Sequence, residues 1–327
     1  MKNFWKNLPR PIMVLAPMAD VTDASFRRVI AKYGKPDVTW TEFVSADGLF
    51  LGGRDALMKD LMFTESERPI IAQFFTSRPE MMEKAAALAL ELGFDGVDIN
   101  MGCPDKSIER QGADADLIKT TELAREIIKA AKKGTQVKIP VSVKTRIGFN
   151  TNQLDTWLPE LLAEEPAVVT VHARTRKEMS KVPARWEEVK RAVEIRDAFR
   201  NSEGNKIETL IFGNGDALDL NDARAKAELS GADGVMLGRA IFGNPWLFDK
   251  TKKFSEILPE ERLKVLVEHT NLYEELLGGS KNFAIMKKHF KAYVNGWEGA
   301  KELRAKLMET ENAKQVDEII STYLKNI

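Results

Sequence analysis

The chain has 327 residues, of which 43% are hydrophobic and 30% charged, and its formal net charge is zero. This length accommodates one large domain and a small one, and the composition is that of an ordinary soluble globular protein. No apolar run approaches the length of a membrane span, and the first ten residues lack the apolar stretch of a signal peptide. We therefore expect a cytoplasmic protein without a membrane partner, in which any polyanion is bound by a local basic patch.

Short apolar runs rich in β-forming residues alternate with helical stretches along most of the chain, which is the pattern of repeated βα units. Eight runs are expected to form strands: Ile12–Ala16, Val38–Glu42, Ile70–Phe74, Gly96–Asn100, Val141–Thr145, Val168–His172, Thr209–Gly213 and Val235–Gly238. Helical stretches between them include Pro79–Leu92, Leu117–Lys132, Trp186–Phe199 and Leu220–Ser230. Eight such units predict an α/β fold of the (β/α)8 TIM-barrel type, with an open doubly wound sheet as the alternative.

The pattern changes after Trp246, where no further strand is expected. Four amphipathic helical stretches follow: Leu258–Leu277, Phe283–Tyr293, Ala300–Leu307 and Gln315–Leu324. Glycine-containing turns such as Gly278-Gly279-Ser280 separate them. We expect two domains, a barrel over residues 1–250 and a small all-α helical bundle over residues 257–327.

Catalytic groups in such a barrel collect at the carboxyl ends of the strands. Polar residues stand at these ends here, among them Glu42, Gln73, Asn100, Lys144, Arg146 and His172. The last two ends are rich in glycine, in Gly213-Asn214-Gly215-Asp216 and Gly238-Arg239. Exposed backbone N–H groups there predict a phosphate site, whereas either pair alone is also typical of a plain turn.

Two residues at these ends point to chemistry. Lys144 lies in a run of alternating apolar and polar residues, which predicts that its side chain points into the barrel. Burying a charged lysine costs free energy unless it meets a negative group. That group is either a bound anionic cofactor or the carboxylate of Asp98 or Glu42. Cys103 is the only cysteine, so it forms no intramolecular disulfide and no cysteine-cluster metal site. It is either a packed small hydrophobe or a working thiol. No spacing of the histidines suggests a metal site.

The motifs in this order and spacing resemble those of the tRNA-dihydrouridine synthases, over the stretch from Leu15 to about Met308. They are Ala16-Pro17-Met18-Ala19 with Thr22-Asp23 and Phe26-Arg27, Asn100-Met101-Gly102-Cys103-Pro104, Val143-Lys144-Thr145-Arg146-Ile147-Gly148, Val171-His172-Ala173-Arg174-Thr175-Arg176, Gly213-Asn214-Gly215-Asp216 and Gly238-Arg239-Ala240. Two stretches depart from the family pattern: Met179-Ser180-Lys181-Val182-Pro183, and Gly112-Ala113-Asp114-Ala115-Asp116 with its two carboxylates. Both loops are candidates for RNA contact, so they leave the placement of the substrate open.

The resemblance implies an FMN-binding barrel followed by a helical tRNA-binding domain, with NADPH or NADH as reductant. Reduced flavin would deliver hydride to C6 of a tRNA uridine, and Cys103 would protonate C5, since an ordinary thiol holds its proton at neutral pH. Lys144 would face the edge of the flavin ring that gains negative charge. The remaining cofactor-binding residues implied are Pro17, Met18, Ala19, Gln73, His172, Asn214, Gly215, Asp216, Gly238 and Arg239.

The substrate is expected to be bound by residues from both parts of the chain. Asn100 is a candidate to bind the uracil edge. Arg174 and Arg176 are candidates for the RNA phosphates or the target base, with solvated salt bridges as the alternative. Lys287, Lys288 and Lys291 are candidates for phosphate contacts, within a basic stretch that also contains Lys281, Lys301, Arg304 and Lys306. Phe290, Tyr293 and Trp297 are interleaved for packing or base stacking, and His269 and His289 are expected to be surface or packing residues. We expect a monomer that binds one tRNA and extrudes the target base.

Two other functions fit the residues. One is a flavin-dependent reductase of a free pyrimidine or another small unsaturated substrate, which the basic helical stretch argues against. The other is a non-catalytic tRNA-binding protein. A barrel that has lost its catalytic activity does not need polar residues at the strand ends, so this function is disfavoured by the presence of Cys103, Lys144, His172 and Asn100.

Overall fold

The computed structural model describes residues 3–104 and 113–326, so that Gly112 of the acidic stretch lies outside the described residues. Eight parallel strands form one curled sheet in the order β1-β8-β7-β6-β5-β4-β3-β2. A single bridge between Val14 and Val38 joins the two outer strands and closes the barrel. The strands are β1 (Ile12–Leu15), β2 (Thr39–Ser45), β3 (Ile70–Phe75), β4 (Gly96–Met101), β5 (Val141–Arg146), β6 (Val168–His172), β7 (Leu210–Asn214) and β8 (Gly234–Leu237). The predicted (β/α)8 fold is confirmed.

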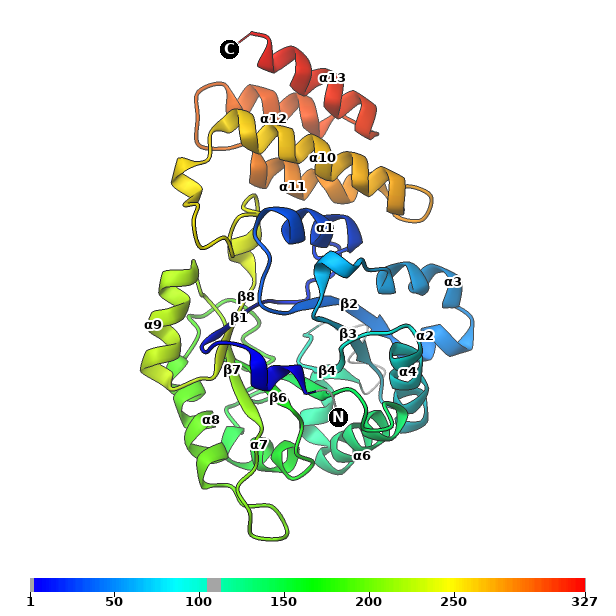
Figure 1. Cartoon of the computed structure of the whole chain (residues 1–327), viewed down its shortest axis with the longest axis vertical. Helices are drawn as coiled ribbons and strands as arrows, with labels where there is room; N and C mark the ends of the chain where they lie inside the picture. The colour runs from blue at the N-terminus through cyan, green and yellow to red at the C-terminus, as the bar shows by residue number, and fades with distance from the viewer. Residues whose placement is uncertain (1–2, 105–112, 327) are drawn as a thin grey trace.

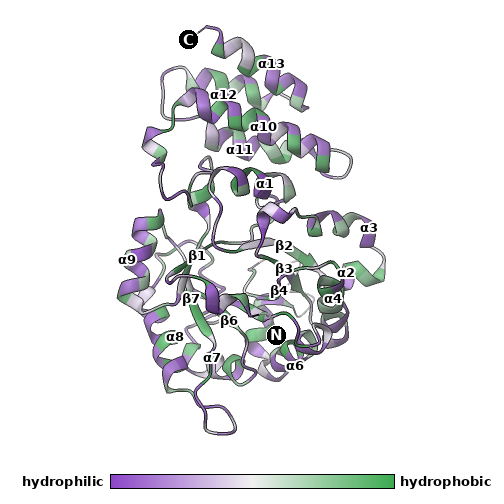
Figure 2. Ribbon diagram, in the orientation of Figure 1, coloured by the Kyte–Doolittle hydropathy of each residue, from purple (hydrophilic) through white to green (hydrophobic). Residues whose placement is uncertain are grey.

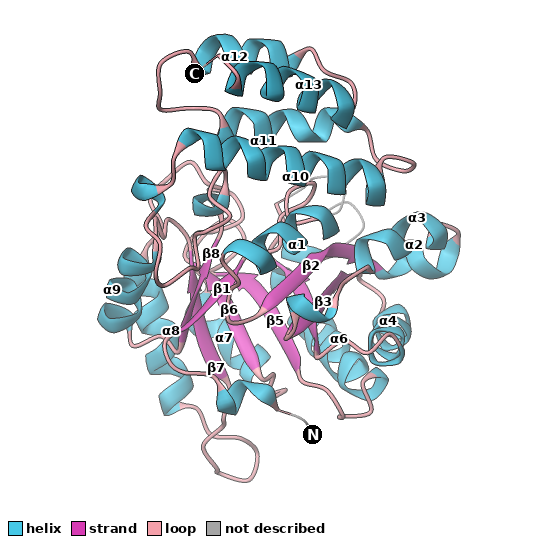
Figure 3. Ribbon diagram, turned by 45° about the horizontal axis from the view of Figure 1, so that its top comes forward, coloured by secondary structure: helices cyan, strands magenta, loops and turns pink. Residues whose placement is uncertain are grey.

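Helices surround the strands, as Figures 1 and 3 show. They are α1 (Ala24–Tyr33), α2 (Ala46–Leu51), α3 (Arg54–Leu57), α4 (Pro79–Glu91), α6 (Thr121–Gly134), α7 (Leu154–Leu162), α8 (Trp186–Ala198) and α9 (Leu220–Ser230). Their outer faces are polar and their inner faces apolar, so purple and green alternate along them in Figure 2. Asp23 begins α1 by accepting the backbone N–H of Phe26 at 3.0 Å, and Asp219 caps α9 in the same manner.

The strand β2 contains a β-bulge that the sequence pattern does not predict. Its pairing with β3 shifts between Trp40 and Phe43, so that one extra residue is inserted on the β2 side. Thr41 Oγ1 accepts the backbone N–H of Gln73 at 3.1 Å within this bulge. A bulge redirects the side chains next to it, and here it turns Glu42 away from the regular ladder. Alternating hydrophobicity alone does not reveal such an insertion.

The chain ends in four helices that cover one side of the barrel above α1 (Figure 1). They are α10 (Pro259–Leu277), α11 (Met286–Tyr293), α12 (Ala300–Met308) and α13 (Ala313–Leu324), with the short 3-10 helix η7 (Phe283–Ile285) before α11. One continuous apolar cluster contains side chains of α1, including Phe26 and Ile30, together with Leu266 and Phe290 of these helices. The terminal helices therefore share a core with the barrel.

Two histidines lie in this shared core. His269 and His289 are both fully buried, with ring centroids 4.6 Å apart, and Phe26 stacks on His269 at 4.7 Å. Phe290 and Tyr293 are fully buried as well, so they pack and offer no surface to a base. Among the helices that the structure describes, none has both the length and the apolar composition needed to cross a membrane.

Candidate active site

A cavity of about 630 Å³ opens at the carboxyl ends of the strands. Its walls include most of the predicted site residues: Pro17, Met18, Gln73, Asn100, Cys103, Lys144, His172, Arg174, Asn214, Gly215, Asp216, Gly238 and Arg239. Ala19 is exposed beside it, and Arg176 lies half-buried over the ring of Phe149, so neither lines the cavity. Lys287, Lys288 and Lys291 lie on α11, apart from the cavity. The barrel topology thus brings together residues that are far apart in the sequence.

A buried polar cluster forms one wall. Gln73 Nε2 donates to Asp98 Oδ2 at 2.6 Å, and Ser142 Oγ donates to the other oxygen of Asp98. Because both carboxylate oxygens are engaged, the amide of Gln73 is held in one orientation, in which its Oε1 is buried without a hydrogen-bond partner among the described residues. Burial raises the pKa of Asp98 to about 6. The wall therefore offers an unsatisfied acceptor to a ligand that carries an N–H group.

Lys144 projects from β5 beside Asn100 of β4, to which it is paired in register. Burial, together with the positive charge of Arg146, lowers the pKa of Lys144 to about 8. The alternative of a salt bridge from Lys144 to Asp98 or Glu42 is not formed among the described residues: Asp98 is bonded to Gln73 and Ser142, and Glu42 pairs with Lys281. The positive charge of Lys144 is available to an anionic group in the cavity.

Cys103 lies two residues after the end of β4 and is half-buried against an apolar cluster of Phe75 and Ala113, on which Phe43 also packs. The segment before it is fixed from two sides: Asn100 Oδ1 accepts the backbone N–H of Gly102 at 3.1 Å, and Arg146 Nε donates to the carbonyl oxygen of Gly102 at 2.6 Å. The thiol therefore stands at a defined place on the cavity wall. Arg146 also lines the cavity, although the sequence placed it only at a strand end and assigned it no role.

The opposite wall is an ion-pair network around Asp216. Its carboxylate accepts hydrogen bonds from Arg174, from Arg239 at 2.6 Å and from the backbone N–H of Ala184 at 2.9 Å. The hydrogen bond from Arg174 lowers the pKa of Asp216. Arg174 thus forms the salt bridge that the alternative expected, but the side chains of Arg174 and Asp216 are 2% and 31% exposed, so the pair is only partly open to solvent.

His172 takes part in the same network. Arg174 Nη1 lies 3.1 Å from His172 Nε2, and because a guanidinium only donates, this nitrogen is the unprotonated one. Burial and the positive charge of Arg146 hold the pKa of His172 well below its usual range. The ring is therefore a neutral, oriented group at the cavity wall.

Glycines at the ends of β7 and β8, Gly215 and Gly238, line the cavity. Gly215 has φ +126°, and a Cβ there would lie 2.8 Å from Ala184 Cβ, so only glycine fits. The side chain of Asn214 donates to the carbonyl oxygen of Met236 at 2.7 Å and ties the two strands together. No group of three or more histidine, cysteine or acidic side chains arranged to hold a metal ion is found in residues 3–104 and 113–326.

Comparisons with known proteins give a consistent result. The family model described as dihydrouridine synthase matches residues 14–327. A protein of Bacillus subtilis named "Probable tRNA-dihydrouridine synthase 2" is 39% identical over 325 residues, which cover 98% of this chain and 97% of that protein. A "Probable tRNA-dihydrouridine synthase" of Staphylococcus epidermidis is 37% identical, with 98% and 96% covered.

Solved structures support the fold alone. A variant of NCR from Zymomonas mobilis aligns with a TM-score of 0.51 at 16% identity, over 76% of this chain and 90% of that one. Histamine dehydrogenase from Rhizobium sp. 4-9 aligns with a TM-score of 0.52 at 12% identity, over 80% of this chain and 48% of that one.

Proposed function

The chain belongs to the dihydrouridine synthase family, and from that premise we propose that it is a flavin-dependent tRNA-dihydrouridine synthase whose cavity binds FMN. The observation that carries this proposal is that Cys103, Lys144 and Gln73 line one cavity at the carboxyl ends of the strands, and that Oε1 of Gln73 is buried without a hydrogen-bond partner among the described residues. The resulting reaction is the reduction of the C5–C6 double bond of uridine in tRNA, with NADPH or NADH as the source of electrons.

The cavity residues fit FMN. Gln73 Oε1 offers an acceptor to a ring N–H, and Lys144 offers a positive charge where the reduced ring gains negative charge. Gly215 and Gly238 present backbone at the ends of β7 and β8, where a phosphate is bound in many barrels. Arg239 supplies a guanidinium beside them, and Asp216 orients it. When bound, reduced FMN supplies the hydride for C6 of the uracil.

The protein's own residues hold the substrate and supply the proton. Cys103 gives its thiol proton to C5, so one hydride and one proton add across the double bond, and the thiolate regains a proton from water. Asn100, fixed at the end of β4, is the candidate to bind the uracil edge. Arg146 and Arg174 line the same cavity; Arg146 places positive charge near the base and its phosphate, whereas the charge of Arg174 is paired with Asp216 and its guanidinium is a candidate for hydrogen bonds to the substrate.

We assign residues 1–250 to FMN binding and catalysis and residues 257–327 to tRNA binding. Lys287, Lys288 and Lys291 on α11 are the proposed phosphate contacts, whereas Lys281 is not available, because it is ion-paired to Glu42 and Asp60. A flipped uridine reaching the cavity requires a tRNA held by these helices above the barrel.

The test compares two substrates. The protein, supplied with FMN and NADPH, is incubated with unmodified tRNA or with free uracil, and the products are identified by mass spectrometry. Dihydrouridine in tRNA, with free uracil left unreduced, is the expected result. Reduction of free uracil at a comparable rate would instead show a small-molecule reductase, and tRNA binding without NADPH oxidation would show a non-catalytic protein.

A further inference from the structure

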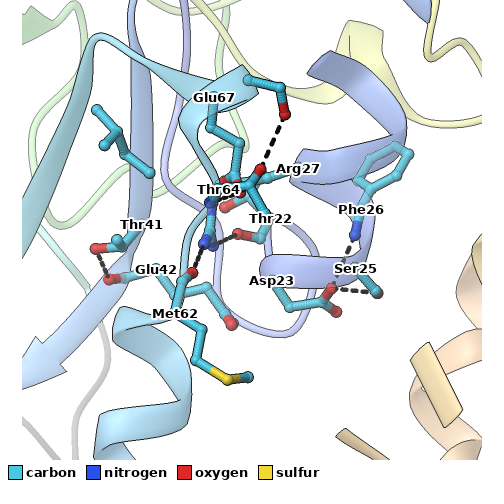
Figure 4. A network of polar contacts seen from close by, with 12 residues as sticks. Thr22, Asp23, Ser25, Phe26, Arg27, Thr41, Glu42, Met62, Thr64 and Glu67 are labelled. Carbon is cyan, nitrogen blue, oxygen red and sulfur yellow. Dashed lines mark hydrogen bonds and ion pairs between the residues drawn. The ribbon is translucent and has the colours of Figure 1, made fainter. Parts of the chain in front are cut away.

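The side chain of Glu42 links two parts of the molecule that the proposed function requires to act together. Its Oε1 accepts the backbone N–H of Asp20, in the loop that follows β1. Its Oε2 pairs with Lys281 Nζ at 2.9 Å, in the connection between α10 and η7. One carboxylate therefore contacts both the rim of the cavity and the C-terminal helices. The bulge in β2 places it there, and Figure 4 shows Glu42 beside Thr41 on this strand.

The loop on the barrel side is tightly held. Met18 lines the cavity, its backbone N–H donates to Thr22 Oγ1 at 2.9 Å, and its carbonyl oxygen accepts the N–H of Thr22 at 3.0 Å. Arg27, itself buried, donates to the carbonyl oxygen of Thr22 at 2.8 Å (Figure 4). Asp20 is left in the middle of this turn with φ +55°, and Glu42 holds its amide.

The helical side is held as firmly. The backbone N–H of Lys281 donates to the carbonyl oxygen of Leu277 at 2.8 Å, at the end of α10. Tyr273 Oη donates to the carbonyl oxygen of Asn282 at 2.9 Å. The ammonium of Lys281 also pairs with Asp60 at 2.8 Å. The side chains of Lys281 and Glu42 are 18% and 5% exposed, so solvent screens this pair little.

A second ion pair across the same junction provides a contrast. Lys32 of α1 pairs with Glu268 of α10 at 2.7 Å, and these side chains are 59% and 30% exposed. Glu268 also accepts a hydrogen bond from Tyr33 Oη at 2.6 Å, again on α1. This pair joins helix to helix and makes no bond to the Met18–Thr22 loop. An exposed pair of this kind contributes little to stability.

We propose that Lys281 is a positioning residue, which through Glu42 couples the placement of the C-terminal helices to the Met18–Thr22 loop at the rim of the cavity. The proposal rests on the proposed function in taking these helices as the part that holds tRNA. A tRNA bound to the helices is then presented to the cavity in a fixed relation to the loop that borders it. Loss of the link affects the placement of the uridine and leaves the binding of tRNA phosphates intact.

The experiment compares Lys281→Met and Glu42→Gln with Lys281→Arg as the conservative variant and Lys32→Met as the matched control. Hydrogen exchange of the peptide containing Met18–Thr22 is measured first, without substrate. We expect faster exchange in Lys281→Met and Glu42→Gln, and wild-type exchange in Lys281→Arg and Lys32→Met. Faster exchange in Lys32→Met to the same extent would overturn the proposal, because it would show a general loosening of the junction.

Kinetics provide the second arm. In Lys281→Met, kcat for tRNA is expected to fall roughly tenfold, as for a misplaced reacting group, with the tRNA Kd and the rate of flavin reduction by NADPH unchanged. A fall in flavin reduction by the same factor, or a kcat no lower than that of Lys32→Met, would contradict a positioning role. If the wild-type protein forms no dihydrouridine, the proposed function fails, and hydrogen exchange alone still decides whether the link exists.

Discussion

The guanidinium of Arg146 and the carbonyl oxygen of Gly102 are joined by a hydrogen bond of 2.6 Å, one residue before Cys103. The same guanidinium donates to the carbonyl oxygens of Thr175 at 3.1 Å and Met179 at 3.0 Å. Arg146 is 5% exposed, so these bonds are shielded from water. The side chain of Arg146 therefore links the segment that carries the thiol to the loop that follows β6 through hydrogen bonds.

Replacing Arg146 by lysine tests whether these hydrogen bonds position Cys103 for catalysis. Lysine keeps the charge but has no planar fork, so it cannot reach all three carbonyl groups. We expect kcat for tRNA to fall roughly 10- to 100-fold while the protein stays folded, since small misplacements of a reacting group cost that much. Steady-state kinetics and far-UV circular dichroism measure this, with the half-exposed Arg191→Lys on α8 as control. Wild-type kcat in Arg146→Lys would show that Cys103 needs no such support.

The strands and the cavity were predictable from sequence because both depend on local pattern. Apolar runs such as Val168–His172 predict buried strands, and polar residues at their ends meet at one face of a barrel whatever the details of the loops. The carboxyl-end residues Gln73, Asn100 and Lys144 were placed in this way, and all three line the cavity. What each side chain contacts there was not predictable.

The sequence could not reveal contacts that depend on backbone irregularity or on distant partners. Lys281 belongs to a basic stretch and was expected on an RNA-binding surface, but it is ion-paired to Glu42, 239 positions away in the sequence. Glu42 lies within the bulge in β2, between Trp40 and Phe43, and the alternation of residues does not reveal this bulge. His269 and His289 were expected on the surface or in packing, and their burial follows from the docking of α10 and α11 on Phe26.

The buried histidines predict a dependence of stability on pH. Burial lowers the pKa of His269 to about 3 from its usual 6.5, and it holds that of His289 well below the usual range. The unfolded chain thus binds more protons than the native protein below about pH 6.5, so stability is lost as the pH falls through this value. At about pH 5 His269 alone accounts for ~2 kcal/mol of this loss.

Urea unfolding of wild type and His269→Phe at neutral pH and at about pH 5 measures the contribution of His269 to the pH dependence of the free energy of unfolding. The variant is expected to lose ~2 kcal/mol less than wild type between the two conditions, because groups distant from His269 contribute equally in the two proteins. Equal losses in the two proteins would show that His269 is protonated in the native state and would contradict its burial as a neutral ring.

The basic residues of α11 predict a salt-dependent contact with tRNA. Changing Lys287 and Lys288 to glutamate is expected to weaken tRNA binding and to reduce the slope of log Kd against log salt by about one per lost phosphate contact. Flavin reduction by NADPH should be unchanged. Lys314→Glu, on the outermost helix α13 (Figure 1), is the matched control, and its effect should be much smaller. Unchanged affinity in the double variant would remove α11 from the RNA-binding surface.

Dihydrouridine mapping by mass spectrometry tests the central claim most directly, with unmodified tRNA, FMN and NADPH supplied to the wild-type protein and to Cys103→Ala in parallel. Wild type is predicted to form dihydrouridine at a defined position, and the variant is predicted to lose this activity or to be slowed by a factor of at least ~100, while NADPH still reduces its flavin at the normal rate. Equal yields and rates of dihydrouridine formation in the two proteins would contradict the assignment of Cys103 as the proton donor.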